Sequence, residues 1–143
     1  MTTIRQILEK KPGVYSIDPG ATVLDALNRL AEKNVGALLV MKGDRLVGIF
    51  SERDYARRMI LHGRSSKETT VDEVMTREVF TIAPEATAGD CMVHMTDRHI
   101  RHLPVVEGGR VVGVISIGDV VRTMIDDLRF TIRQLESYIR SGG

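Results

Sequence analysis

The sequence contains an internal repeat, which constrains the fold more than any other feature. Residues 14–60 align on residues 79–125 without a gap, with Pro84 in the place of Pro19, an offset of 65 positions. Neither copy of so short a unit can bury its apolar face alone. We therefore expect two copies related by a pseudo-twofold axis around a shared core, with any pocket at that axis present twice. The other matching residues are Ala21, Thr22, Asp25, Gly48, Ser51 and Asp54, which recur as Ala86, Thr87, Asp90, Gly113, Ser116 and Asp119.

Composition and charge argue against several classes of protein. The 143 residues suffice for one compact domain or two half-domains that share a core. A net charge of +1 and the absence of Trp argue against nucleic-acid binding, and no apolar stretch is long enough to cross a membrane. Cys91 is the single cysteine, which favours a reducing compartment. Because the N-terminus does not resemble a signal peptide, we expect a cytoplasmic protein.

Apolar periodicity predicts the same order of elements in each copy: strand, helix, strand, strand, helix. The expected fold class is α+β, with two βαββα units and a C-terminal helix. Thr22 caps the first helix, and Lys42-Gly43-Asp44 joins two strands as a hairpin. In the first copy we expect a strand at 14–17, a helix from 22, strands at 37–41 and 45–50, and a helix at 52–61. In the second copy we expect a strand at 79–82, a helix at 87–98, strands at 102–106 and 110–115, and a helix from 117.

Four segments follow from this organisation: a first unit at 1–62, a linker at 63–70, a second unit at 71–125, and a helical tail at 126–143. Residues 119–140 contain no Gly or Pro, and their apolar residues are spaced by four and three positions alternately, as in a coiled coil. We expect a homodimer in which the tails pair or dock on the partner's core. The alternative is a helix that folds back on its own domain. The apolar residues are Val121, Ile125, Leu128, Ile132, Leu135 and Ile139.

The candidate chemistry lies in a repeated motif, Gly-apolar-apolar-Ser-x-x-Asp, at 48–54 and 113–119. Each motif lies where a strand gives way to a helix, so backbone N–H groups there can attract an anion. The Ser hydroxyl can bind phosphate, and the Asp carboxylate can accept both hydroxyls of a ribose. The alternative is a capping box, which stabilises a helix by about 1 kcal/mol without any ligand. Two copies in the same register favour ligand binding.

Together these motifs resemble the cystathionine-β-synthase (CBS) domain, which normally occurs as a tandem pair called a Bateman module. The resemblance covers residues 4–125 and rests on Tyr15-Ser16-Ile17-Asp18-Pro19, on residues 99–106, and on both Gly-x-x-Ser-x-x-Asp motifs. It implies a regulatory module that binds an adenosine-containing ligand in clefts between the copies and modulates an unknown partner protein. AMP is the expected ligand, ATP, ADP and NAD are alternatives, and no metal is required.

The resemblance also implies which residues line the two clefts. In each cleft one copy supplies Ser-x-x-Asp and the other supplies the strand edges that hold adenine. The first cleft would use Ser51, Asp54, Ile82, Ile100, Arg101 and His102. The second would use Ser116, Asp119, Ser16, Ile17, Ala21, Val35, Gly36 and Ala37. Four further residues inside the motifs complete the candidate set: Ile49, Arg53, Val114 and Gly118.

The two clefts are expected to differ in charge. Arg53, Arg101 and His102 can meet phosphate in the first cleft, whereas the second has Gly118 and small residues in the matching places. This asymmetry predicts AMP in the first cleft and leaves occupancy of the second open. The arginines are alternatively solvated surface charges, and His102 alternatively binds only a backbone carbonyl.

No enzymatic motif accompanies these residues. Ser51 and Ser116 have no His partner by motif, and the sequence has no Gly-x-Ser-x-Gly, P-loop or dinucleotide fingerprint. We therefore expect a protein that is not an enzyme. A nucleotide hydrolase and a ligand-free structural adaptor are the alternatives.

Overall fold

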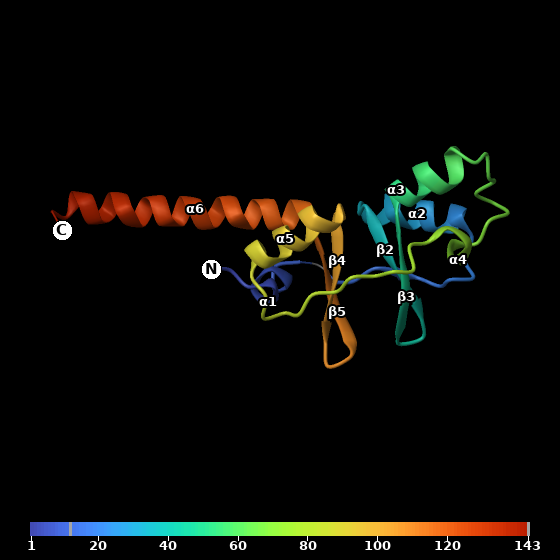
Figure 1. Ribbon diagram of the computed structural model, residues 1–143, viewed down its shortest axis with the longest axis horizontal. Coiled ribbons are helices and arrows are strands. Elements are labelled where there is room, and N and C mark those ends of the chain that lie inside the picture. The colour runs from blue at the N-terminus through green and yellow to red at the C-terminus, as the bar shows by residue number, and fades with distance from the viewer. Residues whose placement is uncertain (12, 143) are drawn as a thin grey trace. The chain divides into compact units, whose positions relative to one another are not determined.

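The computed structural model describes residues 1–11 and 13–142 and confirms a mixed fold of two repeats with a C-terminal helix (Figure 1). Pro12 and Gly143, in the expected first unit and the tail, lie outside the described residues. The first repeat contains β1 (Ser16–Ile17), α2 (Val23–Lys33), β2 (Ala37–Lys42), β3 (Arg45–Ser51), α3 (Glu52–Asp54) and the π-helix η1 (Tyr55–Ile60). The second contains α5 (Ala88–Arg98), β4 (His102–Glu107), β5 (Arg110–Ser116) and α6 (Ile117–Arg140). Two short helices are α1 (Ile4–Leu8) and α4 (Val71–Val74).

The first helix of each repeat begins and ends in the same way. Thr22 and Thr87 are the N-caps, and each side-chain oxygen accepts the N–H three residues later. Asn34 and His99 end the helices in the left-handed conformation, with φ of 55° and 54°. The chain therefore turns directly from the helix into the central hairpin of each repeat.

The two central hairpins are confirmed, but the expected strand at 79–82 is not. β1 pairs in parallel with β2, where the N–H of Leu39 donates to the Tyr15 carbonyl at 3.1 Å. Pro104 stands where Leu39 stands in the first repeat, and proline has no N–H to donate. The second repeat consequently forms a single parallel bridge between Ile82 and Val105.

The expected helix at 52–61 also differs in its geometry. It begins as α3 and continues as η1, where the N–H of Leu61 reaches back five residues to the carbonyl of Ala56 at 3.4 Å. Arg58 in η1 donates to the carbonyls of Val74 and Met75, at 3.0 and 2.6 Å. These bonds hold η1 to the end of α4.

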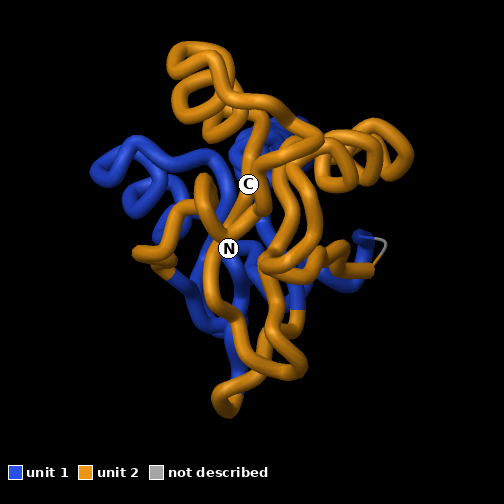
Figure 2. Tube along the Cα trace, turned by 90° about the vertical axis from the view of Figure 1, so that its right-hand side faces the viewer, with its two compact units in different colours: residues 1–12, 81–107, 113–143 blue, residues 13–80, 108–112 orange. Residues whose placement is uncertain are grey.

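The compact units do not follow the order of the chain (Figure 2). One unit comprises residues 1–12, 81–107 and 113–143, and the other comprises residues 13–80 and 108–112. Helix α1 therefore packs with the second repeat, where Ile4 N–H donates to the Ala86 carbonyl at 2.8 Å. Helix α4 makes the same bond in the first repeat, from Val71 to Ala21, also at 2.8 Å. The sequence-based division, by contrast, places residues 1–62 together.

Buried residues form two clusters, one in each unit, and the expectation of a core shared between the copies stays a prediction. The first repeat buries Val23, Leu38, Phe50 and Val71 in one cluster. The second repeat and α1 bury Ile4, Cys91, Leu103 and Ile115 in the other. Each short helix supplies apolar side chains to the repeat on which it packs, and this is what closes each cluster.

Helix α6 has 24 residues and continues well beyond α5 in Figure 1. Its first turns pack on their own unit, where Val120 is fully buried. Asp127 also accepts a hydrogen bond from the Thr2 hydroxyl at 2.6 Å. The predicted coiled-coil residues remain between 41% and 73% exposed: Val121, Ile125, Leu128, Ile132, Leu135 and Ile139.

Candidate functional site

The first Ser-x-x-Asp motif forms a buried hydrogen-bonded pair at the beginning of α3. Asp54 Oδ2 accepts from the N–H and the hydroxyl of Ser51, at 2.9 and 3.1 Å. Asp54 Oδ1 accepts from the hydroxyl of Thr76 at 2.9 Å. The Asp54 residue is only 7% exposed. Two of its three donors are hydroxyl groups, which are the donors that a ribose also offers.

The second motif has the same pair with a different third partner. Asp119 Oδ2 accepts from the N–H and the hydroxyl of Ser116, both at 2.9 Å. The Lys11 ammonium lies 2.6 Å from the same oxygen and also donates to the Val114 carbonyl at 2.8 Å. On the other oxygen, Oδ1, an Arg122 nitrogen lies at 3.6 Å. Asp119 is thus paired with positive charge, in contrast to Asp54.

Burial and charge shift the pKa values of Asp119 and of two groups that interact with it, His102 and Cys91. Burial acts to raise the pKa of Asp119, but the Lys11 ammonium and the Ser116 donors outweigh it, and the pKa lies below its ordinary value. Burial lowers the pKa of His102, and Lys11 and Arg101 lower it further against the opposing effect of Asp119. These effects favour the neutral imidazole of His102, which can offer an N–H but no positive charge. Burial and then Asp119 raise the pKa of the Cys91 thiol to about 11, and Cys91 is fully buried in the core of its unit.

Other capping boxes in the chain provide an internal comparison. Three helices begin with Thr3, Thr70 and Thr87, and the residue at the third helical position returns a bond to each cap. Those third residues are all exposed: Gln6, Glu73 and Asp90. Capping alone therefore does not require a buried carboxylate, whereas both Ser-x-x-Asp motifs bury theirs wholly or largely.

The beginning of each last helix offers fewer donors to an anion than expected. The N–H of Glu52 donates to the Gly36 carbonyl at 3.1 Å, and the N–H of Asp54 donates to Ser51 Oγ at 3.2 Å. In the second repeat, the N–H of Ile117 donates to the Arg101 carbonyl at 2.8 Å. Any ligand here depends mainly on side-chain oxygens and charges.

Those carbonyl bonds place the expected strand edges beside the motif of their own repeat. The unit of the first repeat holds Ser51 and Asp54, with Ile49 half-buried in β3 and Arg53 exposed. It also holds six half-buried residues assigned to the second cleft: Ser16, Ile17, Ala21, Val35, Gly36 and Ala37. The other unit holds Ser116, Asp119, Val114, Gly118, Ile82, Ile100, Arg101 and His102. Because each expected cleft combines residues of both units, the clefts themselves stay a prediction.

Sequence reasoning missed Lys11 and Thr76. Each lies just after a short helix, and each bonds to the motif carboxylate of the repeat on which that helix packs. Leu8 lies against Gly113 and Met75 lies against the equivalent glycine, Gly48, so Leu8 and Met75 are themselves equivalent. They are 67 positions apart, however, whereas the aligned repeats are offset by 65. The segment between α1 and β1 has two extra residues, and a gapless alignment therefore does not match the two short helices. Only the grouping of α1 with the second repeat reveals the correspondence.

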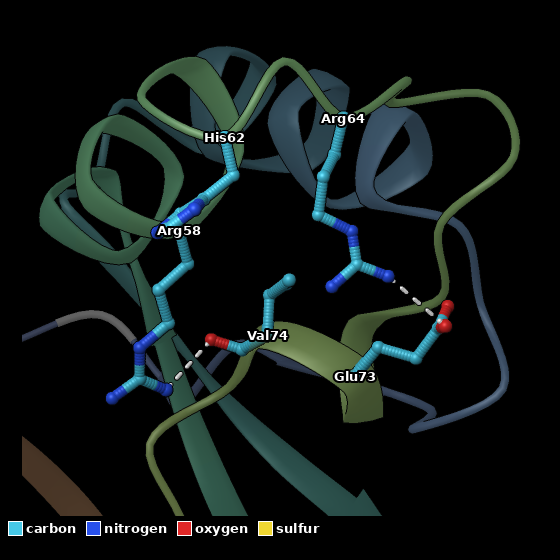
Figure 3. Close-up of a pocket in the computed structure, with 5 residues that line it drawn as sticks. All are labelled: Arg58, His62, Arg64, Glu73 and Val74. Carbon is cyan, nitrogen blue, oxygen red and sulfur yellow. Dashed lines mark hydrogen bonds and ion pairs between the residues drawn. The ribbon is translucent and has the colours of Figure 1, made fainter.

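A separate open groove of about 440 Å³ lies in the unit of the first repeat (Figure 3). It is lined by Arg58, His62, Arg64, Glu73 and Val74. The Arg64 guanidinium pairs with Glu73 at 3.1 Å, and Arg58 binds the backbone at the end of α4. The groove shares no residue with the candidate set, and its arginines already have structural partners.

Among residues 1–11 and 13–142, no three side chains of His, Cys, Asp or Glu gather as a metal site would require. Within the same residues, no helix is both long and apolar enough to span a membrane.

Two repeats of a helix, a hairpin and a further helix, each with a Ser–Asp pair where its last helix begins, define a tandem module. The chain belongs to the CBS domain family, whose model matches residues 4–61 and 71–126. The match includes both Ser-x-x-Asp motifs and the whole of both aligned copies, 14–60 and 79–125. CBS pairs are in general regulatory ligand-binding modules and are typically not catalytic.

Known relatives agree with this assignment. The chain is 44% identical over 126 residues to CBS domain-containing protein CBSX3, mitochondrial, of Arabidopsis thaliana, which covers 85% of this chain and 61% of that protein. A solved protein with CBS domains from Burkholderia ambifaria MC40-6 has a TM-score of 0.85 at 47% identity, covering 88% of this chain and 96% of that one. The hexameric CBS-CP12 protein of bloom-forming cyanobacteria has a TM-score of 0.76 at 27% identity, covering 85% and 71%. Because one relative is named as mitochondrial, the expected cytoplasmic localisation stays a prediction.

Proposed function

We propose that this chain is a regulatory module that binds an adenosine nucleotide, with AMP preferred over ADP, ATP and NAD. The ribose hydroxyls donate to the Asp54 carboxylate beside Ser51, and Arg53 faces the phosphate. The second repeat completes the site with a surface for adenine and phosphate, made of Ile82, Ile100, Arg101 and His102. The bound nucleotide modulates a partner protein, in line with the regulatory role of CBS pairs.

One observation carries this proposal: the Asp54 carboxylate is buried among hydroxyl donors, whereas the acids of ordinary caps in this chain are exposed. A carboxylate has about four acceptor positions, and the structure fills three of them at Asp54. The hydroxyls of Ser51 and Thr76 can rotate away, so ribose hydroxyls can replace them without leaving a charged group unpaired. A diol requires such a carboxylate, with acceptor positions that neutral donors can vacate.

Thermal unfolding with added ligands tests the proposal. A nucleotide that binds only the folded chain stabilises it by about 2.7 kcal/mol at a hundredfold excess over Kd. We expect AMP to raise the melting temperature most, and the same samples should show no turnover of ATP by chromatography. No shift with any of AMP, ADP, ATP, NAD or adenosine would exclude the proposal in favour of a structural adaptor. Turnover would favour a hydrolase.

A variant of Arg101 tests how the phosphate is recognised. Arg101 is exposed and directly precedes β4, so its substitution is expected to leave the fold intact. Arg101→Ala should weaken AMP binding about tenfold and change adenosine binding little, because adenosine has no phosphate. An equal loss for both ligands would show that Arg101 does not act on the phosphate.

We also propose that the chain forms a homodimer through α6. The six exposed coiled-coil residues together present roughly 600 Å² of apolar surface per chain, so a pair would bury about 1,200 Å², the lower bound of a specific interface. CBS-domain proteins assemble in known cases, as the hexameric CBS-CP12 protein illustrates. Ligand binding then has a second subunit on which to act.

A further inference from the structure

Lys11 donates to the carboxylate of the second Ser–Asp pair, as Thr76 donates to the carboxylate of the first. In the first repeat, Thr76 donates its hydroxyl to Asp54 and its N–H to the Ile49 carbonyl, both at 2.9 Å. In the second repeat, the Lys11 ammonium alone binds the equivalent acceptors, Asp119 and the carbonyl of Val114. The acceptors are conserved between the repeats, but one donor is neutral and the other is charged.

The position of Lys11 is fixed by the packing of α1 on the second repeat. Ile4 and Ile7 are buried there, and the side chain of Leu8 lies against Gly113, where a Cβ would collide with it. The N–H of Lys11 then donates to the carbonyl of Leu8 at 3.1 Å. Only 29% of the Lys11 side chain and 11% of the Asp119 side chain are exposed. The ion pair is therefore largely buried and lies next to the core of its unit, in a position fixed by the packing of α1.

This contact changes what Asp119 can offer to a ligand. Three donors already converge on Oδ2, and Arg122 lies near Oδ1. A ribose that binds through both carboxylate oxygens needs a lone pair on Oδ2. Even if the Ser116 hydroxyl rotates away, the Ser116 N–H and Lys11 fill both lone pairs of Oδ2, so the ribose must displace Lys11. A displaced ammonium would leave two charges in a largely buried place without their partner, which is costly. Thr76 imposes no such cost at Asp54, because a neutral hydroxyl can rotate away.

We propose that Lys11 is a built-in occupant of the Asp119 ribose position, which closes the second site and leaves one adenosine site per chain, at Asp54. This inference rests on the proposed function and adds a residue that decides how many nucleotides the module takes. Lys11 lies in the segment between α1 and β1, outside the aligned repeat, so this segment makes the two ribose positions differ.

Calorimetric titration with adenosine tests the inference, because adenosine carries no phosphate that Lys11 might attract. The test variant is Lys11→Met, and the matched control is Lys10→Met, which removes the same charge from an exposed neighbour. Wild type and Lys10→Met should bind one adenosine per chain, whereas Lys11→Met should bind two. In an Asp54→Asn background, Lys11→Met should still bind one, and adding Asp119→Asn should abolish it.

Lys11→Gln serves as a second variant if Lys11→Met does not fold, because the amide is still a donor but carries no charge. Two adenosines bound by wild type, or one bound by both Lys11 variants, would overturn the inference while the proposed function stands. If wild type binds none but Lys11→Met binds one, the inference holds and the assignment to Asp54 fails. If no variant binds adenosine, both are wrong.

Discussion

Asp54 and Asp119 are equivalent residues whose third partners differ in charge. Both accept the N–H and hydroxyl of the preceding Ser, as a capping box requires. Thr76 leaves Asp54 as a buried acid among neutral donors, whereas Lys11 makes Asp119 half of an ion pair. The capping and ligand-binding interpretations are therefore not exclusive at Asp54. At Asp119, capping and charge pairing account for the observed contacts.

The lowered pKa of His102 predicts that the folded chain loses stability on mild acidification. Its folded pKa lies below the ordinary value, so the unfolded chain binds protons more readily once the pH falls below about 6.5. The stability due to the neutral imidazole is fully present above that pH and is lost as the pH falls toward the folded pKa. His102→Gln should therefore flatten the decline in unfolding free energy between about pH 7 and pH 5, measured by urea denaturation.

His94→Gln is the matched control for this experiment, because His94 is exposed on α5. Its curve is the reference for removal of one exposed imidazole, and only His102→Gln should flatten the decline beyond it. If His102→Gln follows the wild-type curve through the same range, burial does not hold the His102 imidazole neutral.

At the scale of elements, the short helices reach their repeats through two equivalent glycines. A Cβ at Gly48 would lie 2.5 Å from Met75 Sδ and 2.9 Å from the Thr76 carbonyl oxygen, which is backbone. A Cβ at Gly113 would meet only the side-chain atoms of Leu8 among its three nearest contacts. Gly48→Ala should therefore cost more than Gly113→Ala, about 3 against 1 kcal/mol in urea denaturation. Equal costs would show that the close backbone approach at Gly48 is not what fixes α4.

Helix α6 supports a prediction about assembly. Ile125, Ile132 and Ile139 share one coiled-coil position, and Val121, Leu128 and Leu135 share the other. Isoleucine in the first position with leucine in the second favours two parallel helices. The double variant Ile132→Ser/Leu135→Ser should therefore shift the chain from dimer to monomer in light scattering. The substitutions leave the Thr2–Asp127 hydrogen bond of the unit in place.

Phe130 provides the matched control for the α6 variant. It is 58% exposed, almost as Leu135 is at 59%, but it lies outside the four-and-three spacing. Phe130→Ser should remain dimeric. A double variant that also stays dimeric would show that α6 does not hold the dimer together.

Much of the order of helices and strands was predictable from the sequence, because the same pattern occurs in both copies of the repeat. The helices, hairpins and Ser-x-x-Asp positions follow from apolar spacing and turn residues, which are local signals. The short parallel pairing at Ile82 was also open to prediction, because Pro104 cannot donate a bond. The π-helical geometry of η1 has no sequence signal that we can identify.

At the scale of the whole molecule, sequence order misleads about which segments pack together. Helix α1 begins the chain but completes the core of the second repeat, and α4 completes that of the first. Local patterns cannot reveal such an exchange, because it depends on contacts between residues far apart in the chain, such as Ile4 and Ala86. Lys11 escaped notice for the same reason, although the Asp119 motif itself was predicted.

Calorimetric titration of AMP into wild type, Asp54→Asn and Asp119→Asn tests the central claim most directly. Both variants replace the motif carboxylate by an amide in equivalent capping boxes, but Asp119→Asn also leaves the Lys11 ammonium without its ion-pair partner, so the folded state of both variants is checked before titration. Asp54→Asn should weaken AMP binding about 10- to 100-fold, because the ribose loses a charged acceptor, and Asp119→Asn should change it much less. Wild-type affinity in Asp54→Asn, or an equal loss in both variants, would contradict the account of Asp54 as the ribose-binding residue.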